Sequence, residues 1–130
     1  MRPKVELVPG TRADVEEYAR NYGYMPIEQR AIIVAAKIEG RVIGIGGVAF
    51  FPGKIALAFA DMSEEARHYP VSIHKAGRMA LELARKQGVR RIVATATTVE
   101  AGPRWLLRLG FVKVAQDEVD VYVFDPPQAA

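Results

Sequence analysis

The clearest helical pattern of hydrophobic and polar positions lies between residues 71 and 87. Charged residues recur there at steps of three and four, and apolar residues occupy the opposite face. Gly88 follows this stretch, and glycine commonly takes the left-handed position just beyond a helix. The pattern therefore predicts one amphipathic helix over residues 71–87, with its end at Gly88.

Three apolar runs before this helix predict strands. Ala31–Ile38 and Val42–Phe51 flank a turn at residues 39–41 and so form a β-hairpin, and Lys54–Met62 follows a Pro-Gly turn. The second strand of the hairpin contains glycines, whose missing side chains allow a bulge or the close approach of another backbone. Because these strands are apolar almost without interruption, we expect a sheet that is covered on both faces.

The N-terminal segment predicts a strand, a helix and a loop. Lys4–Val8 reads as a short alternating strand. Thr11 is a favourable N-cap, and Asp14 stands where the second residue of a capping box would be. We therefore predict a helix over Arg12–Tyr22, followed by a loop over Tyr24–Arg30.

The C-terminal third predicts a strand, a short helix and two further strands. Alanine and β-branched residues over Ile92–Val99 indicate a buried strand, and Pro103–Leu109 indicates a short helix with an apolar face. Two strands follow, separated by a turn at residues 116–118. We expect the last one, Val119–Phe124, at an edge of the sheet, where it either pairs with a second copy in a homodimer or is kept soluble by Asp120.

The complete order is β-α-β-β-β-α-β-α-β-β. This order predicts an α/β (α+β) fold, with a mixed sheet of six to seven strands flanked by helices. A chain of 130 residues is most simply one domain. We expect that domain over residues 1–125 and a disordered tail over residues 126–130.

Composition excludes several classes of site. The sequence contains no cysteine, which rules out disulfides, thiolate metal sites and a cysteine nucleophile. The longest apolar run is too short to span a bilayer, and the N-terminal residues lack the apolar run of a signal peptide. We therefore expect a cytoplasmic protein that does not act at a membrane.

The formal net charge is +3, and the basic residues are clustered. They gather at residues 67–78 and again at 90–91 and 104–108, where they either form a local anion site or lie on solvated faces. No nucleic-acid-binding motif accompanies them, so we do not expect nucleic acid as a partner. His68 and His74, in a loop and a helix, do not have the spacing of a metal site.

The order of elements and three local features resemble the GCN5-related N-acetyltransferase (GNAT) superfamily. The features are the hairpin turn EGRVIG at residues 39–44, the amphipathic helix ending at Gly88, and Leu-Gly-Phe at residues 109–111. The resemblance extends from Val5 to about Phe124. It implies a mostly antiparallel sheet, acetyl-CoA as co-substrate, and acetyl transfer to a primary amine of a small molecule or a protein.

The resemblance also implies where acetyl-CoA binds. In this family the pantetheine arm lies between the fourth and fifth strands, here those ending at Asp61 and covering residues 92–98. The loop before the central helix donates backbone amides to the pyrophosphate, which a helix N-terminus favours by its partial positive charge. Amides near the end of the fourth strand polarise the thioester carbonyl. The implied binding residues are Met62, Ser63, Val71, Ser72, Ile73, His74 and Lys75.

Acetyl transfer further requires a base for the amine and an acid for the thiolate. Asp61 ends an apolar strand and is the preferred base, because partly buried carboxylates are typical of catalytic sites. Glu64, just beyond, is the second candidate. Leu106 stands where the family usually has its acidic tyrosine, so Tyr69 or Tyr122 would have to replace it.

The chain departs from the family pattern at further positions. Before its central helix the family has Arg or Gln, two residues, Gly, one residue, and Gly or Ala, whereas this chain has Tyr69, Ser72 and His74 there. Val99 replaces a common asparagine. These departures resemble degenerate, phage-encoded versions of the fold. The alternative is therefore a structural or interaction protein whose partners are virion proteins.

Overall fold

The computed structural model describes residues 3–95, 99, 102–116 and 119–127 of the chain. In these described residues, seven strands and three α-helices follow one another in the predicted order, and one short 3₁₀ helix precedes the second α-helix. Their bounds are β1 (Val5–Pro9), α1 (Arg12–Tyr22), β2 (Ala31–Ile38), β3 (Arg41–Phe51), β4 (Ile55–Met62), η1 (Ala66–His68), α2 (Pro70–Lys86), β5 (Ile92–Thr95), α3 (Pro103–Leu109), β6 (Val112–Gln116) and β7 (Asp120–Phe124).

The strands form one sheet in the order β1-β2-β3-β4-β5-β7-β6. Strands β4 and β5 pair in parallel, and the other neighbours pair antiparallel, which confirms the mixed, mostly antiparallel sheet. The predicted position of the last strand at an edge is wrong. Strand β7 lies between β5 and β6, because it pairs with both, and it has no free edge for a second copy.

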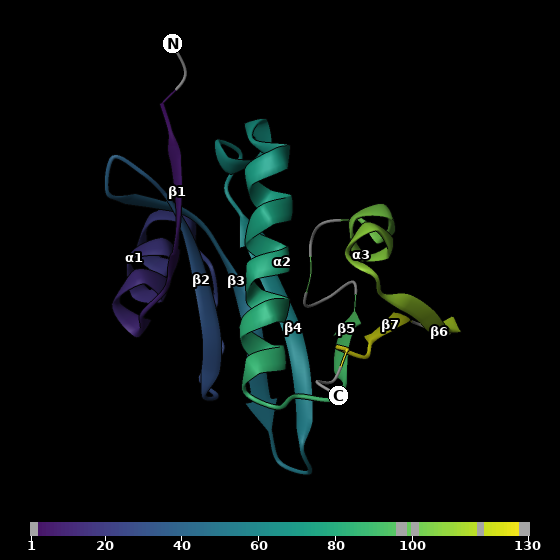
Figure 1. The fold of residues 1–130 in the computed structure, drawn as a ribbon. Helices are drawn as coiled ribbons and strands as arrows, with labels where there is room; N and C mark the ends of the chain where they lie inside the picture. Colours follow the sequence, from purple (N-terminus) through teal and green to yellow (C-terminus); the bar gives the residue numbers. More distant parts are fainter. Residues whose placement is uncertain (1–2, 96–98, 100–101, 117–118, 128–130) are drawn as a thin grey trace.

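The helices cover both faces of the sheet, as the apolar strands predict (Figure 1). On one face, Val15 and Tyr18 of α1 pack against alternate residues of the central strands, including Phe59. On the other face, α2 and α3 cover the intervening residues, with Leu81 and Leu106 in the same cluster. The side chains of β2–β4 are therefore divided by strand alternation between an α1 layer and an α2–α3 layer.

Local signals explain the ends of α1. The Thr11 hydroxyl accepts a hydrogen bond from the Asp14 amide, and the Asp14 carboxylate accepts one from the Thr11 amide, so the predicted capping box is confirmed. Gly23 ends the helix in the left-handed conformation at φ 69°.

The glycines of β3 include one that permits a close backbone approach, as expected. At Gly47, which has φ 157°, an added Cβ would lie 1.8 Å from the carbonyl oxygen of Ile32 on β2. No residue with a side chain fits there without moving the neighbouring strand. The glycine therefore keeps β2 and β3 paired in their observed register.

Two predicted boundaries differ from those in the structure: the end of the strand that begins at Ile92, and the end of the folded domain. Strand β5 ends at Thr95, and residues 96–98 of the predicted strand lie outside the described part of the chain. Pro126, placed in the disordered tail, is buried and borders a surface hollow with Arg78 and Phe124, so the packed structure extends past residue 125. The rest of the predicted tail, residues 128–130, is also outside the described residues. Within the part that the structure describes, none of the helices combines the length and the apolar composition needed to cross a bilayer.

Candidate active site

A wedge opens between β4 and β5. Among the residues that the structure describes, the two strands pair only where they begin, with Ala56 opposite Ile92 and Leu57 opposite Val93, while β4 continues to Met62. Further along, Ala60 forms a single parallel bridge with Val99. The edge of β4 beyond Leu57 faces β5 and, within the described residues, is joined to that side of the sheet only by this bridge, and we call this edge the wedge.

The backbone of β4 presents one of its two predicted donors to this wedge. The Ser63 amide donates to the Ile43 carbonyl of β3 at 3.0 Å, so it is used inside the sheet. Met62 is opposite Gly44, one step along the ladder. Hydrogen-bonded and non-hydrogen-bonded pairs alternate in an antiparallel ladder, so the Met62 amide points away from β3 and toward the wedge.

Asp61 lies on the α1 side of the sheet, at the end of β4. Its Oδ2 accepts a hydrogen bond of 2.7 Å from the hydroxyl of Tyr18, a residue with no exposed surface. The ring of Tyr18 lies 4.7 Å from that of Tyr22 and 5.8 Å from that of Tyr24. Three tyrosines of α1 and the following loop thus lie together on the side of the sheet that carries this carboxylate.

The negative charge of Asp61 affects the pKa of one tyrosine in this cluster. Burial raises the pKa of the Tyr24 phenol, and the negative charge of Asp61 raises it further. Tyr24 therefore stays protonated at physiological pH. The loop over residues 24–30, which carried no motif in the sequence, supplies part of the surroundings of Asp61.

The other two candidate catalytic residues lie elsewhere. Glu64 is exposed in the turn after β4, where its carbonyl accepts a hydrogen bond from the Arg67 amide. Tyr69 is half-buried and packs with Met62 and Ile73 against the cluster around Ile43, on the α2 side of the sheet. The structure does not bring the three candidates to one point.

Within the part of the chain that the structure describes, two amides at the start of α2 lack a hydrogen-bond partner, whereas all of residues 71–75 were expected to bind. Tyr69 is its N-cap and Pro70 its first residue, which has no N–H. The Ile73 amide donates to the Tyr69 carbonyl at 3.0 Å, and the helical ladder uses the amides that follow. Val71 and Ser72 are therefore the residues whose amides remain available at this helix end.

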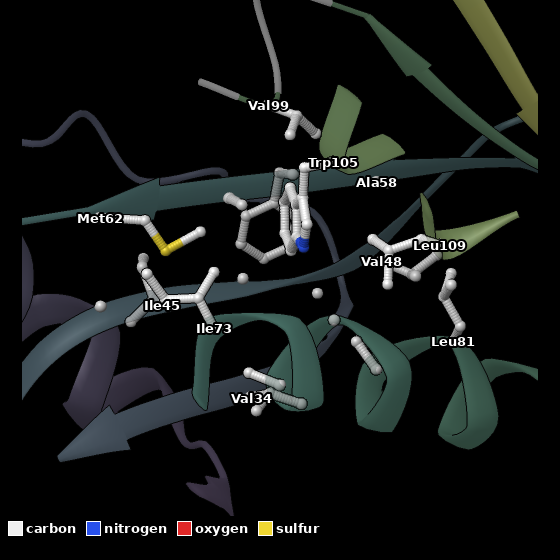
Figure 2. A pocket seen from close by; sticks show the side chains of 18 of the residues that line it. Val34, Ile45, Val48, Ala58, Met62, Ile73, Leu81, Val99, Trp105 and Leu109 are labelled. Atoms are coloured by element: carbon white, nitrogen blue, oxygen red, sulfur yellow. The ribbon is translucent and has the colours of Figure 1, made fainter. Parts of the chain in front are cut away.

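The side chains of the first two turns of α2 point in different directions. Lys75 is exposed, and Val71 retains 69% of its surface. Ile73 packs toward the sheet, into the cavity drawn in Figure 2. His74 is half-buried, and its Nδ1 is buried without a hydrogen-bond partner among the described residues. The exposed side of the helix start thus combines two free amides with the Lys75 ammonium group.

The sequence did not predict the apolar cavity between α2, α3 and the sheet (Figure 2). It measures about 60 Å³ and is bordered by Met62 and Val99 at the wedge. The signal that could have found it is the clustering of small residues, since glycine and alanine on facing surfaces leave space. The small residues in its lining are Ala36, Gly44, Gly46, Gly47, Ala58, Ala60, Ala76, Gly77 and Ala80.

No protein-family model matches the sequence, and no curated protein is significantly similar to it. Solved structures do match over nearly the whole chain. A ribosomal-protein-alanine N-acetyltransferase from Escherichia coli aligns with a TM-score of 0.73 at 10% identity, covering 98% of this chain and 97% of the other.

Two further acetyltransferases align similarly. An N-acetyltransferase from Staphylococcus aureus Mu50 has a TM-score of 0.71 at 14% identity, covering 95% of this chain and 99% of its own. A GNAT-family acetyltransferase from Streptococcus pneumoniae has a TM-score of 0.69 at 15% identity, and the alignment covers 92% of this chain and 96% of the other. At these identities the likeness concerns the fold, and the chain has the fold of the GCN5-related N-acetyltransferases.

Proposed function

We propose that this chain is an acetyl-CoA-dependent N-acetyltransferase that acts on a primary amine. The observation that carries the proposal is the wedge between β4 and β5, with the Met62 amide facing into it and Asp61 at the same end of β4. A donor and an acceptor approaching from opposite sides of the sheet would meet at this strand end. The acetyltransferase fold of the similar structures supports the same chemistry.

The transfer needs no covalent enzyme intermediate. The neutral amine nitrogen attacks the thioester carbonyl carbon, forming a C–N bond, and the C–S bond then breaks to release CoA as a thiolate. The amine nitrogen loses one proton, which Asp61 accepts as general base, and the thiolate takes up one proton. Negative charge develops on the carbonyl oxygen during attack, and the Met62 amide is placed to stabilise it.

In this proposal the pyrophosphate of acetyl-CoA binds at the start of α2. In the proposed complex the Val71 and Ser72 amides donate to the pyrophosphate of acetyl-CoA, and the Lys75 ammonium group adds a charge-assisted contact. Ser63 and Ile73 contribute through packing rather than through their amides, which are used within the fold. A site with these donors fits a phosphate without the glycines of the family pattern.

The proton for the thiolate has two sources in this proposal. Leu106, at the usual tyrosine position, is buried and cannot donate. Tyr69 packs in the same cluster as Met62 and is the side chain we assign to this role. Water is the other source, since a thiol of ordinary pKa near 8.5 leaves readily as a thiolate.

The experiment is an amine screen with acetyl-CoA, following release of free thiol from the full chain. With an accepted amine, Asp61→Asn is expected to lower turnover by at least about 100-fold, the usual size of a lost general base. Glu64→Gln separates the two candidate carboxylates and is expected to keep most of the turnover. Equal turnover of Asp61→Asn and the unaltered chain would contradict the base assignment.

A further inference from the structure

The cavity under α2 is formed by small residues on two facing surfaces. On β3, Gly44 and Gly46 share the α2-facing side with their β4 partners Met62 and Ala60. Above them, α2 presents Ala76 and Ala80, which are also small. Neither surface fills the space between them. What remains is an apolar cavity of about 60 Å³.

The cavity lies at the place where a thioester would react. Met62 and Val99 border it, and both also border the wedge between β4 and β5. Under the proposed function, the acyl carbonyl lies beside the Met62 amide. A chain that extends from that carbonyl toward α2 would enter the cavity directly.

Trp105 provides a second, independent observation. Its indole lines the cavity among apolar side chains (Figure 2), and its Nε1 is buried with no acceptor among the described residues. A buried donor without a partner is unfavourable unless a ligand or water supplies an acceptor. A ligand that enters the cavity from the wedge would supply that acceptor through an oxygen atom. A thioester or pantetheine amide carries such an oxygen beside an apolar chain.

We propose that this cavity binds the hydrocarbon chain of the acyl donor, so that the enzyme accepts propionyl and butyryl groups in addition to acetyl. The inference rests on the proposed function, whose site it extends. Each buried methylene strengthens binding by roughly fourfold, so a butyryl thioester should bind about fifteenfold more tightly than its acetyl counterpart. Longer chains, such as hexanoyl, exceed the space and should lose this advantage.

The test compares acyl groups on two carriers. S-acetyl- and S-butyryl-N-acetylcysteamine lack the nucleotide, so their binding, followed by ligand-observed NMR, reports on the acyl cavity alone. Acetyl-CoA and butyryl-CoA, titrated calorimetrically, report on the cavity and the nucleotide site together. The expected result is a butyryl preference on both carriers.

Two matched variants locate the preference. In Gly44→Ala the added Cβ has room, with Ala66 Cβ at 3.6 Å and Met62 Sδ at 3.7 Å, and it narrows the cavity near the wedge. In Gly102→Ala the same methyl group meets nothing within 4 Å. The butyryl preference should fall to about fourfold or less in Gly44→Ala, since a methyl-sized part of the space is gone, and persist in Gly102→Ala. Ala76→Val fills the cavity from α2 and replaces Gly44→Ala if that variant does not fold.

The outcomes separate the two proposals. Acetyl-CoA binding with no butyryl preference, or a preference that Gly44→Ala leaves unchanged, would overturn the acyl cavity and leave the proposed function standing. Butyryl-N-acetylcysteamine binding without binding of any CoA thioester would support the cavity and remove the proposed function. If no thioester binds, both are overturned.

Discussion

One carboxylate at the end of β4 connects the two sides of the candidate active site. Asp61 accepts a hydrogen bond from Tyr18 on α1, while the next residue, Met62, directs its amide into the wedge. The sequence identified Asp61 because it ends an apolar strand. Its tyrosine partner could not be predicted, since the two residues are 43 positions apart and meet only through packing of α1 on the sheet.

Tyr18 is a positioning residue for Asp61 in this account. Tyr18→Phe removes the hydroxyl that holds Oδ2 and is expected to lower kcat while leaving the KM for acetyl-CoA unchanged, and to lower the free energy of unfolding by about 1 kcal/mol. Steady-state kinetics and denaturant unfolding measure these effects.

Tyr22→Phe is the matched control for this change, because Tyr22 lies in the same cluster and is 41% exposed. It removes an equivalent hydroxyl but leaves the hydrogen bond between Tyr18 and Asp61 in place. Identical kcat values for the two variants would show that the Tyr18 hydroxyl does not position the base.

Asp14, in the first turn of α1, makes the stability of the protein depend on pH. Burial alone raises the pKa of its carboxyl, but the Lys37 ammonium group at 2.9 Å and the hydrogen bonds with Thr11 outweigh it and hold the pKa below its usual value near 3.8. A lowered pKa adds stability above the unfolded pKa, and that stability is lost as the pH falls through the folded pKa.

Asp14→Asn is therefore expected to lower the free energy of unfolding by about 1 kcal/mol at pH 7, the usual size of a lost cap. The difference from the unaltered chain should shrink as the pH falls below about 4. Urea unfolding at several pH values measures it, with Glu16→Gln on the exposed face of α1 as the control. A difference that stays constant down to pH 2 would contradict this assignment.

At the scale of elements, α3 docks on α2 through a glycine. A Cβ built at Gly77 would lie 2.8 Å from Cζ2 of Trp105 and 3.1 Å from Cδ1 of Leu109. Mid-helix glycine weakens a helix by about 1 kcal/mol relative to alanine, so packing of α3 is the reason that it is tolerated here. Trp105 therefore packs against α2 at this glycine.

Gly77→Ala tests this contact. Helix propensity alone would stabilise the variant, but overpacking against Trp105 typically costs about 1–3 kcal/mol, so a net loss of roughly 1 kcal/mol is expected. Since the chain has one tryptophan, its fluorescence spectrum should shift as α3 moves. Increased stability with an unchanged spectrum would contradict the close packing.

Local sequence signals predicted the bounds of the helices and strands better than they predicted which strands lie next to one another in the sheet. The bounds of α1 follow from Thr11, Asp14 and Gly23, which act within a few residues of each helix end. The β2–β3 hairpin likewise follows from its short turn and apolar strands. The position of β7 between β5 and β6 depends on pairing between distant segments, so an apolar strand near the C-terminus was wrongly expected at an edge.

At the scale of the whole molecule, the order of strands determines where chemistry is available. The only place along the described sheet where neighbouring strands pair in parallel and then separate is between β4 and β5. The resemblance predicted this wedge, but not which amides face it. The Ser63 amide donates to β3, and the Ile73 amide donates within the start of its own helix. The direction of each amide depends on the register of the strand pairing and on where the helix begins, and the sequence does not specify either.

The proposed activity depends first on binding of acetyl-CoA at this wedge and at the start of α2. Calorimetric titration of the full chain with acetyl-CoA tests it without knowledge of the amine. We expect micromolar binding that is lost in Lys75→Glu and kept in Lys54→Glu, which reverses an exposed charge in the turn before β4. No heat and no thermal stabilisation at millimolar acetyl-CoA would contradict the account, and the fold would then serve as a structural or interaction module.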